Sequence, residues 1–565
     1  MIIRKKLPRP HKLHEPLLHP DHPRPVTRRQ MLAAGLLGAQ AYVLVPTALL
    51  GLGKPRTARA QLASDISQLV TSCGISTTGA GKIPFICFDL SGGANLNGSE
   101  ALIGGPGGQL DFLSTAGYDK LGLPGNMLPN SPNPGSTSGN FIDTSLGLAW
   151  HSDGAILRGV KSKASTGAMA GTNGVAIAAV SQTDTQDNPH NPMYGIWMAG
   201  ANGSLLTLIG TEATTSGGNS EAPMSLINLS AAPSVITQAS DCTGLVNTGQ
   251  LGTMFPNAAD AVAVLESTTR LSGGTVLSGG GGSGGFTTGT TLGDLTVMPG
   301  NGSADATLKT AMLCNYAKAT ALVNTFGNPA ALNPDLDTNI VGGSDSIFTA
   351  TDYQDPDIQA TAAVMKMVVS GFAAAGTIVL TGYDYHDSTR ATGETKNYHA
   401  GQCIGACLEY AKRMGKPLVV YIFSDGSLVS TGMVDDSAAG RGKYGWQGDS
   451  QTSANTVFLV YNPNGRPALI QGGPGNQIGS YNSDGSVNTS SSPAANAVNL
   501  LVQTVILNYM ALHNDQGNYA SIFSPSNATS FPSLAGSVPG LGLGTTAAQL
   551  DPLMAFEPIV NHVIA

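Results

Sequence analysis

Carboxylate and imidazole side chains occur in this chain close to the ends of short apolar runs. They are Asp89, Asp384, His386, Asp425 and Asp449. Oxygen and imidazole donors of this kind bind divalent cations such as Zn²⁺, Mn²⁺, Mg²⁺ or Ca²⁺. Two such cations side by side would form a clamp for phosphoryl or sulfuryl transfer. The alternative is structural, because an aspartate after a strand often starts a turn or caps the next helix.

The apolar runs are rich in β-branched residues and predict buried strands. They span 84–90, 175–180, 377–380, 418–423 and 456–461. Segments with helical periodicity lie between or after them, at 258–271, 306–326, 358–375, 395–414 and 494–513. This alternation predicts an α/β fold with a largely parallel central sheet flanked by helices. Ligands of such sheets bind beyond the carboxyl ends of the strands, which is where the acidic residues recur.

Five polar blocks follow one another over most of the segment 83–473. They are Phe88-Asp89-Leu90-Ser91-Gly92-Gly93-Ala94-Asn95, Asp187-Asn188-Pro189-His190, Gly382-Tyr383-Asp384-Tyr385-His386, and the segments at Ser424 and at Asp449. Their order and spacing resemble a large uncharacterised family of twin-arginine-exported proteins related to alkaline phosphatases and sulfatases. The resemblance implies an alkaline-phosphatase-like α/β core with a two-metal site at the strand ends.

The match to the family motifs is uneven. The block that ends at His386 keeps the Asp and the His of the family's Gly-Phe-Asp-Thr-His motif, whereas Asn95 replaces the Asp of Gly-Gly-x-Asp. His190 lacks the serine of the Ser-His-Phe motif, and the Ser-Glu-Phe-Gly-Arg and Asp-His-Gly motifs are reduced to Ser424-Asp425 and Asp449-Ser450. The resemblance implies metal ligands at Asp89, Asp384, His386, Asp425 and Asp449, with Asn95 and His190 as additional candidates. Because several positions are weakened, a single metal, or none, is an alternative to two.

Two functions follow from these residues. The first is an exported alkaline-phosphatase-like protein whose metal-dependent hydrolysis of phosphate or sulfate esters is reduced or lost. In an active protein, Asp89, Asp384, His386 and Asp425 would hold the metal, and a hydroxyl or a metal-bound water would attack the ester. Hydroxyl groups are available at Ser91, Ser181, Thr183 and Thr185, and no motif selects one of them. The second is a non-catalytic protein of the cell envelope or the secretion machinery that uses the same fold for binding or assembly.

The N-terminal segment has the features of a twin-arginine export signal. Arg28 and Arg29 directly precede an apolar run at 31–52, and Ala58 and Ala60 supply the small residues of a cleavage site. The run is broken by glycine and proline and suits a signal better than a membrane span of ~20 strongly apolar residues. We expect cleavage near Ala60 and a periplasmic or secreted protein that does not span the membrane. The alternative is an uncleaved anchor.

The mature chain is strongly acidic. Removing residues 1–60 takes away 11 of the 28 basic residues and 2 of the 36 acidic ones, which changes the net charge from −8 to about −17. Nucleic acid and anionic lipid both require a basic face, so we expect neither as a partner. The expected partners are the twin-arginine translocase during export and, in the second function, a protein of the envelope.

We expect one large domain rather than several. The predicted boundaries are a signal segment at 1–60, an α/β domain at 61–520 with a flexible Gly/Ser-rich insertion near 271–285, and a C-terminal tail at 521–565. The tail either packs on the core or reaches a partner. Four of the six cysteines allow two disulfide bridges, Cys73 with Cys87 and Cys242 with Cys314. His399, Cys403 and Cys407 share one face of a predicted helix, where a structural role is favoured over a metal or redox site.

Overall fold

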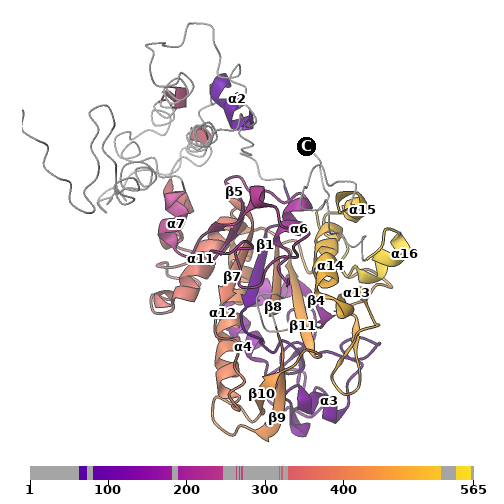
Figure 1. Ribbon diagram of the computed structural model, residues 1–565. Helices are drawn as coiled ribbons and strands as arrows, with labels where there is room; N and C mark the ends of the chain where they lie inside the picture. The colour runs from indigo at the N-terminus through magenta and orange to yellow at the C-terminus, as the bar shows by residue number, and fades with distance from the viewer. Residues whose placement is uncertain are drawn as a thin grey trace, which may run out of the picture.

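The computed structural model describes residues 63–72, 81–180, 189–245, 329–424, 426–523 and 543–560, together with 263, 266–267, 269–270, 317 and 320–321. Within these residues the chain forms an α/β fold around an eight-stranded, largely parallel sheet flanked by helices (Figure 1). The predicted fold class is confirmed at this level. The signal segment 1–60 and the insertion 271–285 lie outside the described residues.

The central sheet has the strand order β12-β4-β11-β8-β1-β7-β5-β6. Strands β8, β1, β7, β5 and β6 pair in parallel, whereas β11 is antiparallel to both of its neighbours, β8 and β4. The sheet is therefore mixed, with one reversed strand. The strands span Phe85–Leu90 (β1), Thr172–Ala179 (β4), Leu206–Gly210 (β5), Ser234–Val235 (β6), Ala373–Leu380 (β7), Leu418–Ser424 (β8), Ala454–Tyr461 (β11) and Gln477–Ile478 (β12).

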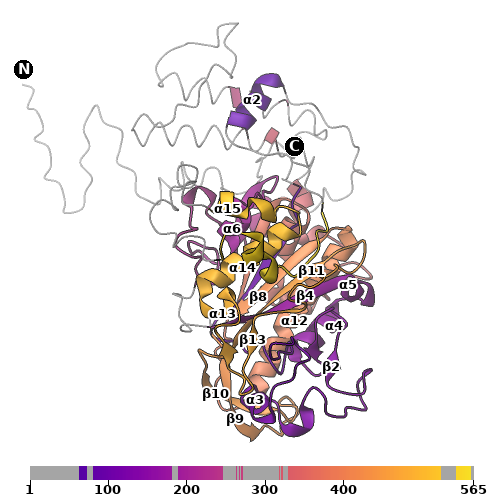
Figure 2. The ribbon, with the colours of Figure 1, turned by 90° about the vertical axis from the view of Figure 1, so that its right-hand side faces the viewer.

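Helices cover both faces of the sheet, as two perpendicular views show (Figures 1 and 2). Side chains alternate along β1, so that Phe88 joins the core beneath α4, α11 and α12 while Phe85 joins the core beneath α6 and α14. Both cores are apolar and buried, which explains why the strands are apolar on both faces. The helices span Ala155–Lys163 (α4), Met193–Met198 (α6), Pro356–Val369 (α11), Ala391–Met414 (α12) and Val498–Ala511 (α14).

Shorter elements complete the described fold. A hairpin of β9 and β10 lies beside α3 at the end of the molecule away from α6 (Figure 1). The further helices and strands are Ser64–Ser72 (α2), Thr115–Lys120 (α3), Gly125–Met127 (η3), Ile142–Asp143 (β2), Trp150–His151 (β3), Thr166–Ala170 (α5), Leu229–Ala231 (η4), Ala239–Gly244 (α7), Pro329–Leu332 (η6), Pro334–Leu336 (η7), Asp352–Gln354 (η8), Leu428–Val434 (β9), Tyr444–Asp449 (β10), Ser480–Tyr481 (β13), Val487–Asn488 (β14), Pro493–Asn496 (α13), Gln516–Asn518 (η9), Tyr519–Ile522 (α15), Ala547–Leu550 (α16) and Asp551–Leu553 (η12).

All five apolar runs predicted as strands form strands of the central sheet, namely β1, β4, β7, β8 and β11. The predicted helix 358–375 is too long, because α11 ends at Val369 and β7 begins at Ala373. Alanine favours helix by intrinsic propensity, but the interior of β7 requires small residues: a Cβ added to Gly376 would lie 2.6 Å from Val364 Cγ1 of α11. Packing between layers therefore outweighs local propensity here.

The described part of the predicted tail packs on the core. Ala555 N donates to Asn508 Oδ1 (2.9 Å), and Ile470 N donates to Ala555 O (3.0 Å). Phe556 is fully buried against Phe458 of β11, with ring centroids 6.0 Å apart. Residues 543–560 are therefore part of the α/β fold.

Cys87, Cys242, Cys403 and Cys407 are buried free thiols. Bridges from Cys87 and Cys242 are thus not formed, and their suggested partners, Cys73 and Cys314, lie outside the described residues. Within the described ranges, no helix is both long enough and apolar enough to cross a bilayer.

Candidate metal centre

The loops that follow β1, β7 and β8 meet at one edge of the sheet, because these three strands are adjacent and parallel. Ser91 N donates to Leu380 O, and Tyr383 N donates to Ser91 O, both at a distance of 3.0 Å. These bonds hold the loop after β7 against the loop after β1. The reversed strand β11 begins at the same edge, and the segment before it is tied there by Ser450 N, which donates to Ser427 O (2.7 Å).

The glycine pair after β1 allows a close approach between loops. Gly92 has a φ of +123°, and a Cβ on this residue would lie 2.6 Å from Asp384 N. Ser424, the last residue of β8, donates from Oγ to Leu90 O (2.6 Å) and accepts from Gly93 N (3.1 Å) and Ala94 N (2.7 Å). Glycine at position 92 is therefore a steric requirement of the loop that carries Asp384.

Three of the predicted ligands converge at this edge. One ligand atom each from Asp384, His386 and Asp449 lies within 4.8 Å of the other two. His386 Nε2 lies 2.7 Å from Asp384 Oδ1 and 3.9 Å from Asp449 Oδ1. Side-chain exposures of 48%, 39% and 46% leave all three groups open to solvent. Two carboxylates and one imidazole make a donor set that can hold a divalent cation such as Zn²⁺ or Mn²⁺.

Two buried tyrosines hold the loop that carries Asp384 and His386. Tyr383 Oη donates to Lys396 O (2.8 Å), while Tyr385 Oη donates to Asn397 Oδ1 (2.9 Å) and accepts from Asn95 N (2.9 Å). Burial raises the pKa of both phenols above the ordinary value, so both hydroxyls keep the proton that they donate. The side chains of Asp384 and His386 therefore project from a loop anchored on either side.

A buried network of charged side chains supports the start of α12, the helix that carries Lys396 and Asn397. Arg390 Nε donates to Glu394 Oε1 (2.9 Å), and Lys443 Nζ donates to the same oxygen (2.8 Å). Arg158 Nη2 donates to Glu394 Oε2 (2.5 Å). Against the cost of burial, the charges of Lys443 and Arg390 lower the pKa of Glu394. Burial and the negative charge on Glu394 instead raise the pKa of Glu100. The network anchors the start of α12 to the β9–β10 hairpin.

Of the other predicted ligands that the structure describes, Asp89 and His190 do not join the cluster of three. Asp89 is fully buried in the sheet, where Oδ2 accepts from Ser220 N (2.8 Å). Asn95 is buried and donates from Nδ2 to Asn97 O (2.9 Å).

His190 is also buried. Its ring stacks on Phe423 with centroids 6.0 Å apart, and burial lowers its pKa to about 4, so the ring is neutral at pH 7. Asp425 and three of the candidate nucleophiles, Ser181, Thr183 and Thr185, lie outside the described residues.

The described residues hold a second group with metal-binding composition: Asp355, Asp357 and His399. The sequence pointed to His399, but paired it with Cys403 and Cys407 along its own helix. The two aspartates were missed because they lie at the start of α11, as its N-cap and in its first turn, and reach His399 only when α11 packs against α12. An Asp-x-Asp pair at the start of a helix, in a protein expected to bind metal, was the available signal.

A surface groove of about 780 Å³ lies elsewhere, lined by polar and apolar residues of the segments 107–110, 137–149 and 474–476. None of its lining residues belongs to either group of Asp and His. Comparison with protein-family models gives no match, and comparison with curated proteins gives no significant match. The choice of site therefore rests on the convergence of Asp384, His386 and Asp449.

Proposed function

We propose that this chain is an exported, alkaline-phosphatase-like protein that hydrolyses phosphate or sulfate esters with the help of a divalent metal. The observation that carries the proposal is the meeting of Asp384, His386 and Asp449 at the carboxyl edge of the sheet. These ligands come from two segments separated by 63 to 65 positions of sequence, on either side of β8. A purely local role for each Asp, such as a turn or a cap, does not require this convergence.

The alkaline-phosphatase-like assignment rests on two supports. One is the order of the sequence blocks around Asp89, His190, Asp384 and Asp449. The other is the largely parallel sheet with loops gathered at its carboxyl edge, where α/β proteins bind ligands. The same sheet is compatible with other doubly wound folds. The order of the sequence blocks is what favours the alkaline-phosphatase-like fold among them.

The arrangement suits ester hydrolysis chemically. A divalent cation at these three residues would polarise an ester oxygen and lower the pKa of a bound water. Asp384 and Asp449 supply the negative charge that holds a cation, and His386 supplies a nitrogen donor. The half-exposed side chains leave the site open to a substrate. Tyr383 and Tyr385 keep the loop in place while the substrate binds and leaves.

The test is metal analysis of the purified protein together with hydrolysis of aryl phosphates and aryl sulfates. We expect stoichiometric metal and turnover in the wild type. Replacing one of three ligands, in Asp384→Asn, should lower metal affinity by on the order of 100-fold and abolish turnover, because the remaining donors hold the cation poorly. Asp436→Asn, an exposed acid in the described part of the chain, is the matched control and should retain both. A wild type that binds no metal and turns over no ester contradicts the proposal.

A second candidate function is a non-catalytic protein of the envelope or the secretion machinery. The observation that favours it is the burial of Asp89 and His190, which the family resemblance offers as ligands, apart from the exposed cluster. Among the described residues, three of the expected donors, Asp384, His386 and Asp449, then meet at the edge. Metal bound without turnover, with full stability retained in Asp384→Asn, would favour this second function.

A further inference from the structure

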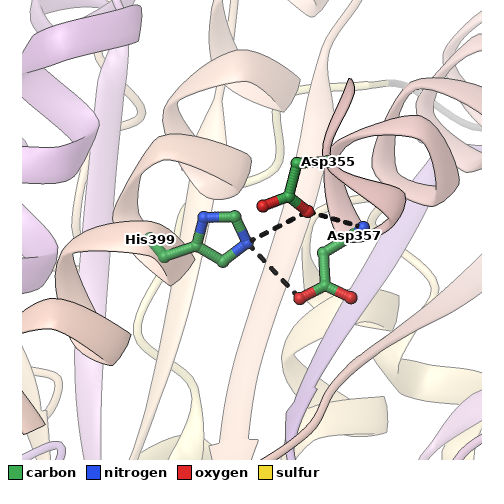
Figure 3. A group of neighbouring side chains, drawn as sticks. All are labelled: Asp355, Asp357 and His399. Atoms are coloured by element: carbon green, nitrogen blue, oxygen red, sulfur yellow. Dashed lines mark hydrogen bonds and ion pairs between the residues drawn. The ribbon is translucent and has the colours of Figure 1, made fainter. Parts of the chain in front are cut away.

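We propose that Asp355, Asp357 and His399 form a second divalent-cation site, suited to Zn²⁺, that joins the start of α11 to the middle of α12. This inference does not depend on the proposed hydrolysis, since the group shares no residue with Asp384, His386 and Asp449. Figure 3 shows the imidazole of His399 directed between the two carboxylates.

The distances fit ligands around a cation better than direct hydrogen bonds. His399 Nε2 lies 3.4 Å from Asp357 Oδ2 and 3.9 Å from Asp355 Oδ1. A hydrogen bond between nitrogen and oxygen spans about 2.7–3.2 Å. Ligand atoms around a tetrahedral zinc ion, with bonds of about 2.0–2.1 Å, lie ~3.4 Å apart. His399 Nε2 is shielded from solvent and has no hydrogen-bond partner, so this nitrogen is available as a metal ligand.

The carboxylates are held in place by the helix that they start. Asp355 is the N-cap of α11, and its Oδ1 accepts from Asp357 N (2.8 Å) and Ile358 N (3.4 Å). Asp357 lies in the first turn. The histidine comes from a different helix, α12, which packs against α11. A cation at this point would connect two helices that the chain otherwise joins only through β7 and its loops.

The charges also favour a divalent cation. In the described part of the chain, no lysine or arginine lies within ion-pair distance of Asp355 or Asp357. The two carboxylates contribute a charge of −2, which a divalent cation balances. The dipole at the start of α11 opposes a cation, but its positive end amounts to only about half a charge. The full charges of the two carboxylates outweigh it.

The donor set selects the kind of metal. An imidazole nitrogen disfavours Mg²⁺ and Ca²⁺, which prefer oxygen ligands, and suits Zn²⁺. Cys403 lies one turn after His399 and is fully buried; burial, with the nearby charges of Asp357 and Asp355, raises the pKa of its thiol to about 12. The thiol is therefore neutral and fills space beneath the site. Asp355 and Asp357 are 42% and 38% exposed, so water can complete the coordination.

A cation here would act on stability more than on chemistry. It would hold the start of α11 to α12, and α12 also carries Lys396, whose carbonyl accepts from Tyr383 in the loop of the candidate metal centre. The site would thus brace the helix on which that loop rests.

The experiment compares zinc content and zinc-dependent melting of the purified, metal-depleted protein and its variants. Zinc alone is the probe. We expect saturating zinc to raise the Tm of the wild type by roughly 2–4 °C. His399→Gln and Asp357→Asn should each bind one equivalent of zinc fewer and lose most of that rise. Asp357→Asn guards against misfolding of the histidine variant, since its side chain is partly exposed. Asp436→Asn is the control. Zinc bound by other histidines contributes equally to every variant and does not affect the differences between them.

The outcomes separate this site from the candidate metal centre. If His399→Gln and Asp384→Asn each bind one equivalent of zinc fewer than the wild type, and the two lost equivalents are different, the protein has two sites. Loss confined to Asp384→Asn overturns the second site and leaves the proposed function intact. If the three groups form only an ion pair, zinc shifts the Tm of the wild type and of His399→Gln by the same amount, which also overturns the proposal.

Discussion

At the scale of single residues, the candidate metal centre depends on a glycine as much as on its ligands. Gly92 and Gly465 have similar φ angles, +123° and +128°. A Cβ at Gly92 would meet Asp384 N at 2.6 Å, whereas a Cβ at Gly465 would meet nothing within 4 Å. A side chain at either position would therefore strain the backbone. Only a side chain at position 92 would also clash with the loop of the candidate metal centre.

We predict that Gly92→Ala destabilises the protein by more than Gly465→Ala. Strain at an unfavourable φ costs on the order of 1–3 kcal/mol in both variants, and the clash at Gly92 adds to it. Gly92→Ala should also weaken metal binding, because the loop that carries Asp384 must move. Denaturant unfolding and metal titration measure both effects. Equal losses of stability in the two variants, with metal binding unchanged, would show that the close approach is unimportant.

The sequence predicted correctly which candidate ligands meet where those residues are near one another in the chain. Asp384 and His386 were predicted as a pair because they are two residues apart in one loop after a strand, and their side chains do meet. Asp89 was predicted from a similar position at the end of β1, but the alternation of the strand turns its side chain into the buried layer beside Ser220. A strand-end Asp in the sequence does not reveal which way it points.

At the scale of elements, the start of α12 is fastened by buried charges rather than by apolar packing alone. Arg390, Glu394 and Lys443 are almost fully buried, and both Arg390 and Lys443 donate to Glu394. Lys443 comes from the segment between β9 and β10, so the hairpin and the helix depend on each other. Removing one partner from such a network leaves a buried charge less well compensated.

We predict that Lys443→Met destabilises the protein by about 3 kcal/mol, because Glu394 and Glu100 lose the nearest ammonium group. The control is Lys120→Met, which removes an exposed pair with Asp484, 3.4 Å long and 55% exposed on both sides. That change should cost less than about 1 kcal/mol. Chemical denaturation of both variants makes the comparison. A Lys443→Met protein as stable as Lys120→Met would mean that the network contributes little to stability.

The elements themselves were predictable to different degrees. Each apolar run rich in β-branched residues became a strand, because burial on both faces leaves a continuous apolar signal. The alanines at the start of β7 carried a helical signal and were assigned wrongly, since their burial between the cores on the two faces of the sheet is a property of the tertiary structure. β5 was missed although its sequence, Leu-Thr-Leu-Ile-Gly, carries a short apolar run, whereas polar residues and glycine interrupt the apolar residues of β9 and β10.

At the scale of the whole molecule, the proposed function requires transport across the inner membrane. The twin-arginine route carries folded proteins, and such a route suits a large α/β fold with ligands drawn from distant segments. We predict that Arg28→Lys combined with Arg29→Lys retains the protein in the cytoplasm, whereas the unchanged chain reaches the periplasm or the medium and begins at Gln61. Cell fractionation and N-terminal sequencing test both points. Export of the double variant at the normal rate would argue against the twin-arginine route.

Some properties followed from the sequence alone because they depend on local composition and order. The export motif, the acidic charge, the α/β class and the pairing of Asp384 with His386 all belong to single segments or to the alternation of segments. The approach of Asp449 to that pair depends on the tertiary structure: β11 runs antiparallel to β8, and its start therefore brings β10 to the carboxyl edge. The same holds for Asp355, Asp357 and His399, which meet only because α11 packs on α12. Distances between segments are set by strand order and helix packing, and no spacing in the sequence encodes them directly.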